Sequence, residues 1–67
     1  MTRAQQDTPE YWAQIVVDVV GRPLDEWAVA ATLESQGLRD VDARERFGHD
    51  NLFLFANEVH RATRTFR

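Results

Sequence analysis

The chain is 67 residues long, which is enough for one small domain and leaves no room for separate cofactor and substrate domains. It has no cysteine, so disulfide frameworks and thiolate metal sites are excluded, and its net charge of -3 opposes nonspecific binding to nucleic acid. Its 43% hydrophobic and 28% charged residues are typical of a globular protein rather than a disordered chain.

The first helix is expected to begin at Pro9, after a flexible leader formed by residues 1–7. Asp7 and Thr8 can accept hydrogen bonds from free helix amides, and proline fits the first helical position because its missing amide hydrogen is not needed there. Apolar residues then recur at three- and four-residue spacing until Gly21 ends the helix. We expect this stripe to face the core; it consists of Tyr11, Trp12, Ile15, Val16, Val19 and Val20.

A second helix is predicted over residues 24–36, directly after the tight corner at residues 21–23. Gly37 supplies the left-handed residue that ends a helix, and Leu38 can fold back onto the last turn. Val29 and Leu33 are expected on the flank of the buried face. The stripe predicted to face the core is Leu24, Trp27, Ala28 and Ala31.

The two tryptophans each lie near the start of a predicted helix. We interpret Trp12 and Trp27 as core wedges whose indole nitrogens reach water or a backbone carbonyl. The acidic pair Asp25 and Glu26 lies in the first turn of the second helix, where carboxylates complement the helix dipole.

A third, shorter helix is predicted over residues 41–47, with Asp40 as its N-cap and Gly48 after its end. It has little apolar surface, so we expect it to close one end of the bundle with Phe47 as its anchor.

The fourth helix has the longest apolar stripe in the chain. His49 or Asp50 is expected to cap it, and no glycine, asparagine or proline stops it before the last residue. The stripe predicted to face the core is Leu52, Phe55, Ala56, Val59, Ala62 and Phe66.

Together these patterns predict an all-α fold, a compact bundle of four short helices in which the third is shortest. Residues 8–67 form a single helical domain behind the leader, and the short connections favour packing between sequential neighbours. No apolar run is long enough to span a bilayer, and the first residues lack the order of a signal peptide, so a cytoplasmic protein is expected.

Residues that could carry catalysis are few. His49 and Asp50 are adjacent at a helix start, where such residues act as caps, and His60 lies about 200° around the helix from Glu58. Ser35 has no histidine near it in sequence. We therefore expect no enzyme activity, no cofactor and no metal site.

A DNA-binding regulator is the alternative, because the second helix, the Gly37 turn and the third helix have the outline of a helix-turn-helix. A recognition helix places its first residues against bases and phosphates, yet this one would place Asp40 and Asp42 there. Arg39 and Arg44 offset these carboxylates only in part. The charge pattern therefore disfavours nucleic acid as the partner.

A noncatalytic protein-interaction or docking module is the favoured interpretation, because residues 52–55 are all apolar and span about 300° of the helix circumference. A small bundle buries an arc little wider than about 100°. If Leu52 and Phe55 face the core, then Phe53 or Leu54 is left exposed unless the third helix or the leader covers it. The expected partner is another protein or a second copy of this chain, and the candidate contact residues are Phe53, Leu54, Asn57, His60, Arg61 and Arg64.

Residues 33–61, LESQGLRDVDARERFGHDNLFLFANEVHR, resemble N-terminal helical modules of uncharacterised actinobacterial proteins, many of them membrane-associated. The pattern is an LES-type helix end, a glycine, a short DAR-containing helix ending in FG, and a FALA-like helix; here FLFA replaces FALA and adds Phe55. The resemblance implies no activity, only a cytosolic N-terminal module of a larger bacterial protein. In such a protein Arg61, Arg64 and Arg67 would face the headgroups of an adjacent membrane. The matching residues are Ala43, Arg44, Phe47, Gly48, Phe53 and Ala56.

Overall fold

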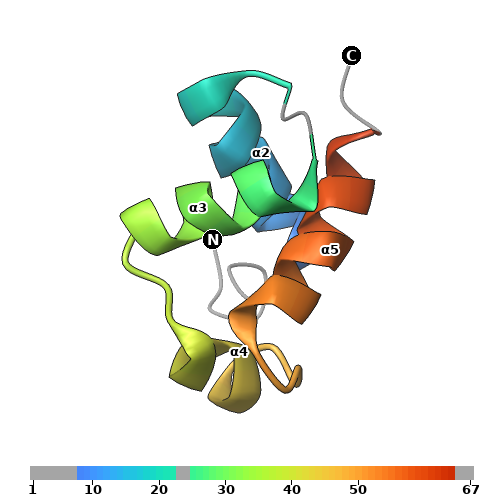
Figure 1. Cartoon of the computed structure of the whole chain (residues 1–67). Coiled ribbons are helices and arrows are strands. Elements are labelled where there is room, and N and C mark those ends of the chain that lie inside the picture. Colours follow the sequence, from blue (N-terminus) through green and yellow to red (C-terminus); the bar gives the residue numbers. More distant parts are fainter. Residues whose placement is uncertain (1–7, 23–24, 65–67) are drawn as a thin grey trace.

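The computed structural model describes residues 8–22 and 25–64, and this part of the chain contains four α-helices and no strand. The helices are α2 (Pro9–Val20), α3 (Glu26–Ser35), α4 (Asp40–Glu45) and α5 (Leu52–Thr63). Helix α5 packs against each of the other three, and α4, the shortest, lies at one end of the molecule beside the first turn of α5 (Figure 1). The prediction of a compact four-helix fold is confirmed; the expected leader, residues 1–7, lies outside the described residues.

Helix α2 begins and ends where the local sequence predicts. The Thr8 hydroxyl accepts a hydrogen bond from the amide of Tyr11 at 3.2 Å, and Pro9 occupies the first turn. Gly21 has a φ of 76°, and its amide donates to the Val17 carbonyl at 2.9 Å. The predicted core stripe is correct only in its first part: Trp12 and Val16 are buried, whereas Val19 and Val20 near the end of the helix are exposed.

Helix α3 turns a different face to the core from the one predicted. Val29 and Leu33, expected on the flank, are completely buried, whereas Ala31 is exposed and Trp27 is 68% exposed; Leu24 lies outside the described residues. The prediction was wrong because α3 is apolar on two faces, and spacing alone does not choose between them. Medium-sized Val29 and Leu33 fill the space toward α2 and α5, while the indole of Trp27 lies at the edge of the bundle.

The connection from α3 to α4 follows its predicted form. Gly37 has a φ of 95°, and the amide of Leu38 donates to the Leu33 carbonyl at 3.1 Å. Leu38 is buried against the core as expected. The apolar side chain therefore fixes the direction in which the chain leaves α3.

The caps of α4 and α5 differ from the predicted ones. Arg39, not Asp40, precedes α4, and its amide donates to the Asp42 carboxylate at 2.9 Å. The carboxylate of Asp40 instead accepts a hydrogen bond from the amide of Leu52 at 2.8 Å, at the start of α5. Asn51, rather than His49 or Asp50, is the N-cap of α5. A residue of α4 thus satisfies a free amide of the helix that it packs against.

The core is centred on α5. Phe55 is completely buried and stacks on Phe47 with ring centroids 3.9 Å apart, so the predicted anchoring role of Phe47 is confirmed. The expected stripe residues from Leu52 to Ala62 are buried; Phe66 lies outside the described part, and α5 ends at Thr63 rather than continuing to the last residue. Trp12 is 9% exposed and contacts Phe47 edge-on, as a core wedge should. Its indole nitrogen, however, is buried with no acceptor among the described residues, contrary to prediction.

Candidate docking surface

The apolar run at the start of α5 divides as the helix geometry requires. Leu52 and Phe55 are buried, Phe53 is half-buried, and Leu54 is 42% exposed. The expectation that this run has more apolar surface than the core can cover is confirmed by Leu54.

Phe53 packs against Trp27 of α3; the leader, which the sequence offered as one possible cover, lies outside the described residues. The two ring centroids are 4.4 Å apart and the ring planes are tilted by 42°. This contact shields part of Phe53 but leaves most of Trp27 in solvent. Phe53 is therefore partly shielded from water, but the indole that shields it is itself exposed on the neighbouring helix.

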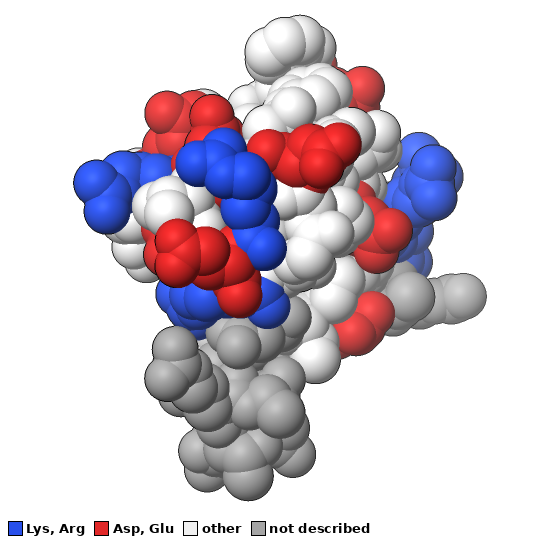
Figure 2. Space-filling view, turned by 90° about the horizontal axis from the view of Figure 1, so that it is seen from below, with Lys and Arg blue, Asp and Glu red and all other residues white. Residues whose placement is uncertain are grey.

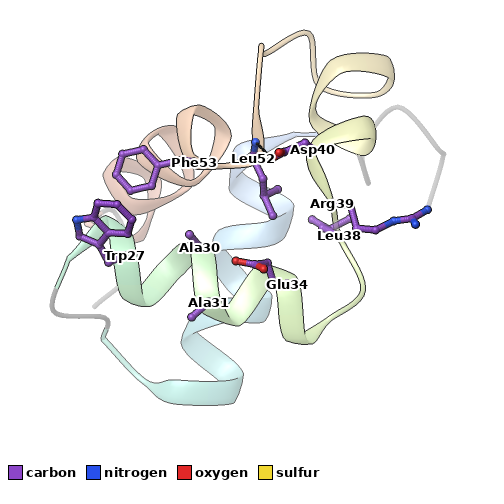
Figure 3. Close-up of a pocket in the computed structure, with 9 residues that line it drawn as sticks. All are labelled: Trp27, Ala30, Ala31, Glu34, Leu38, Arg39, Asp40, Leu52 and Phe53. Carbon is purple, nitrogen blue, oxygen red and sulfur yellow. Dashed lines mark hydrogen bonds between the residues drawn. The ribbon is translucent and has the colours of Figure 1, made fainter.

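A groove of about 480 Å³ opens beside this aromatic pair, between the outer face of α3 and the first residues of α4 and α5. In Figure 3, Trp27 and Phe53 form one end, Leu38 and Arg39 lie at the other, and Glu34 projects between them. Small and apolar side chains line the floor. We call this feature the α3–α5 groove; its lining is Trp27, Ala30, Ala31, Glu34, Leu38, Arg39, Asp40, Leu52 and Phe53.

The charged residues of the groove are not equivalent. The carboxylate of Asp40 accepts a hydrogen bond from the amide of Leu52, so it already has a structural role at the start of α5. Within the described part of the chain, the carboxylate of Glu34 has neither an ion pair nor a hydrogen-bond donor. The side chain of Arg39 is exposed. The groove therefore combines an apolar floor with one carboxylate and one guanidinium that are available to a ligand.

The predicted contact residues do not form one surface. Leu54, Asn57 and Arg61 line a shallow pocket of about 200 Å³ on the outer side of α5, together with His49 and Glu58.

The other predicted contact residues point elsewhere. Phe53 belongs to the α3–α5 groove, and Arg64 lies exposed just after the end of α5. His60 faces α3, where its Nδ1 lies 3.9 Å from Oε2 of Glu26. The α5 residues named from the sequence are thus divided: Phe53 and His60 contact α3, whereas the pocket on the outer side is lined by Leu54, Asn57 and Arg61.

The residues that sequence reasoning missed are on α3. Trp27, Ala30, Ala31 and Glu34 follow the spacing i, i+3, i+4 and i+7, which places them on one helix face. From the sequence, Trp27 and Ala31 were predicted to face the core together with Leu24 and Ala28, and Glu34 was assigned to no face. The signal that could have corrected this is the second apolar stripe, Val29 with Leu33, on the opposite side of the same helix.

Charge on the exposed surface is mixed. On the face shown in Figure 2, arginine and acidic side chains lie next to one another, and no large patch of one sign is seen. Asp40 and Asp42 both lie in the first turn of α4, the helix that would read DNA in the alternative interpretation. Phosphate binding needs an excess of cations, so nothing on this face favours that alternative, which stays a prediction.

Within residues 8–22 and 25–64, no three histidine, aspartate or glutamate side chains converge in a way that could hold a metal ion. None of the helices described is both long enough and apolar enough to cross a bilayer.

Comparison with known proteins gives no relative. No family model, no curated protein and no solved structure matches the chain. The resemblance of residues 33–61 to N-terminal modules of actinobacterial proteins therefore stays a prediction.

Proposed function

We propose that this chain is a noncatalytic docking module that binds a protein through the α3–α5 groove. The observation that supports the proposal most strongly is Trp27, which is 68% exposed although it is packed against Phe53. In this proposal the module acts in the cytoplasm, either as a free adaptor or as the N-terminal part of a larger bacterial protein.

The energetics of a tryptophan held at an interface support this function. A large aromatic side chain buries roughly 150–250 Å² when fully covered, so covering the exposed part of Trp27 would remove about 150 Å² from water. At about 25 cal/mol per Å² this contributes roughly 4 kcal/mol, which is the range of an interface hot spot. The Phe53 contact holds the indole in place before binding, which reduces the entropy lost when a partner docks.

The α3–α5 groove is a better candidate than the outer side of α5. The pocket around Leu54 has less than half the volume of the groove, about 200 against 480 Å³, and it contains no aromatic ring larger than the imidazole of His49. Leu54 is also less exposed than Trp27. We therefore place the docking function on α3 and the start of α5.

Site-specific photo-cross-linking in cells tests this proposal. A benzophenone amino acid would replace Ala31, which is exposed in the groove; Leu54, on the outer side of α5; or Glu10, an exposed control on α2. We expect a protein adduct from position 31 and little or none from the other two. No adduct at position 31, or equal adducts at positions 31 and 10, would contradict the proposal.

A further inference from the structure

We propose that the occupant of the α3–α5 groove is a second copy of this chain, docked with its α3 antiparallel to the first; this rests on the docking function proposed above. The two copies would be related by a two-fold axis near Ala30 and Ala31. Each Trp27 would lie in the groove of the other copy. Such an isologous contact uses one surface twice, so the surface must be complementary to itself.

The outer face of α3 has this self-complementarity in shape. It presents a large exposed residue, Trp27, at one end; at its middle lie the exposed Ala31 and the largely buried Ala30, both of them small residues that line the groove. Small side chains at a crossing point let two helices approach closely. The projecting indole of one copy would then meet the apolar floor beside Leu38 of the other.

The same face is complementary in hydrogen bonding. In an antiparallel pair centred between residues 30 and 31, Trp27 of one copy lies opposite Glu34 of the other, because both are equally far from the centre. Trp27 is largely exposed, and among the described residues its indole makes a ring contact with Phe53 and its N–H donates no hydrogen bond; the Glu34 carboxylate likewise accepts none there. The symmetry would form this charge-assisted hydrogen bond twice.

Charge also favours the antiparallel arrangement. The start of α3 has two carboxylates, Asp25 and Glu26, whereas the far end of the groove has the exposed guanidinium of Arg39. Antiparallel docking brings the acidic start of one α3 toward Arg39 of the other copy. Parallel docking would instead place each carboxylate of α3 against its own equivalent, which is destabilising.

Sedimentation equilibrium of the full chain over a wide concentration range is the first test. We expect reversible formation of a dimer, and Trp27→Ala should raise its Kd by at least about tenfold, as removal of a hot-spot residue does. Leu54→Ala is the matched control, because it removes an exposed apolar side chain outside the groove and should leave the Kd unchanged. Circular dichroism would verify that both variants are folded.

Cysteine cross-linking tests the register, and the absence of native cysteine makes each introduced thiol unique. Ala31→Cys should form a disulfide-linked dimer on mild oxidation, whereas Glu10→Cys should not. A mixture of Trp27→Cys with Glu34→Cys should form the mixed disulfide in preference to either homodimer.

Three results would overturn the inference. A strictly monomeric chain that forms a cross-link from position 31 to a different protein in cells would exclude the second copy and leave the docking function intact. A dimer insensitive to Trp27→Ala would exclude this interface. No adduct of any kind from position 31, with a monomer at all concentrations, would remove both proposals.

Discussion

The two tryptophans offer the sharpest test of the structure, because both lie in the first turns of helices yet their surroundings differ. Trp12 is 9% exposed, whereas Trp27 is 68% exposed. If a tryptophan side chain has a surface of about 250 Å², the parts that are not exposed amount to roughly 220 Å² for Trp12 and about 80 Å² for Trp27. At about 25 cal/mol per Å², truncation to alanine should cost about 5 kcal/mol for Trp12 and at most about 2 kcal/mol for Trp27.

The difference is large enough to measure by urea denaturation of Trp12→Ala and Trp27→Ala, followed by circular dichroism at low protein concentration. A domain of this size is stabilised by roughly 3–10 kcal/mol in total, so Trp12→Ala should be close to unfolded without urea. Trp27→Ala should remain folded, with a midpoint lowered by no more than about 2 M when the urea slope is about 1 kcal/mol/M. Equal losses for the two variants, or a larger loss for Trp27→Ala, would refute the assignment of Trp27 to the surface.

Three further changes test the fold in equilibrium unfolding experiments. Asp40→Ala should lose about 1–2 kcal/mol because the amide of Leu52 loses its acceptor, while Asp50→Ala should be nearly neutral; equal effects would contradict the observed cap. Gly37→Ala should cost about 1–2 kcal/mol although no atom obstructs a methyl group there, because the φ of 95° is strained for any residue with a Cβ, and a neutral result would place the turn in another conformation. Trp12→Phe should cost no more than about 1 kcal/mol, because it removes a buried indole N–H that has no acceptor in the described part of the chain, and a loss of about 3 kcal/mol would show that the N–H has a partner.

The parts of the fold that local chemistry determines were predictable. Thr8, Pro9 and Gly21 set the ends of α2 through their own backbone and side-chain geometry, and Gly37 with Leu38 did the same after α3. Each of these features depends on residues within about one turn of one another.

The parts that depend on distant residues were not predictable. The cap that Asp40 provides for Leu52 joins residues twelve positions apart, so no local pattern indicates it. The face of α3 that became buried was decided by packing against α2 and α5, because the helix has apolar residues on both sides.

The apolar surplus at the start of α5 could be predicted from the sequence, but the residue that packs against it could not. The surplus of apolar residues at the start of α5 pointed to Phe53 and Leu54, and Leu54 is indeed exposed. The sequence could not show that Trp27 covers Phe53, because that contact joins α3 and α5 across the bundle. The groove depends on the packing of α3 against α5, so no local sequence pattern predicts it.

The central claim is that Trp27 lies on an outward apolar face that another protein covers, and iodide quenching of its fluorescence tests this most directly. In Trp12→Phe, Trp27 is the only tryptophan, so the emission reports its environment alone. We predict strong quenching in dilute solution, as for a largely exposed indole, and progressive protection from iodide as the protein concentration rises and a second copy covers the groove. If iodide quenches Trp27 only weakly even in the dilute, folded monomer, the result would contradict the account, because it would place Trp27 in the core.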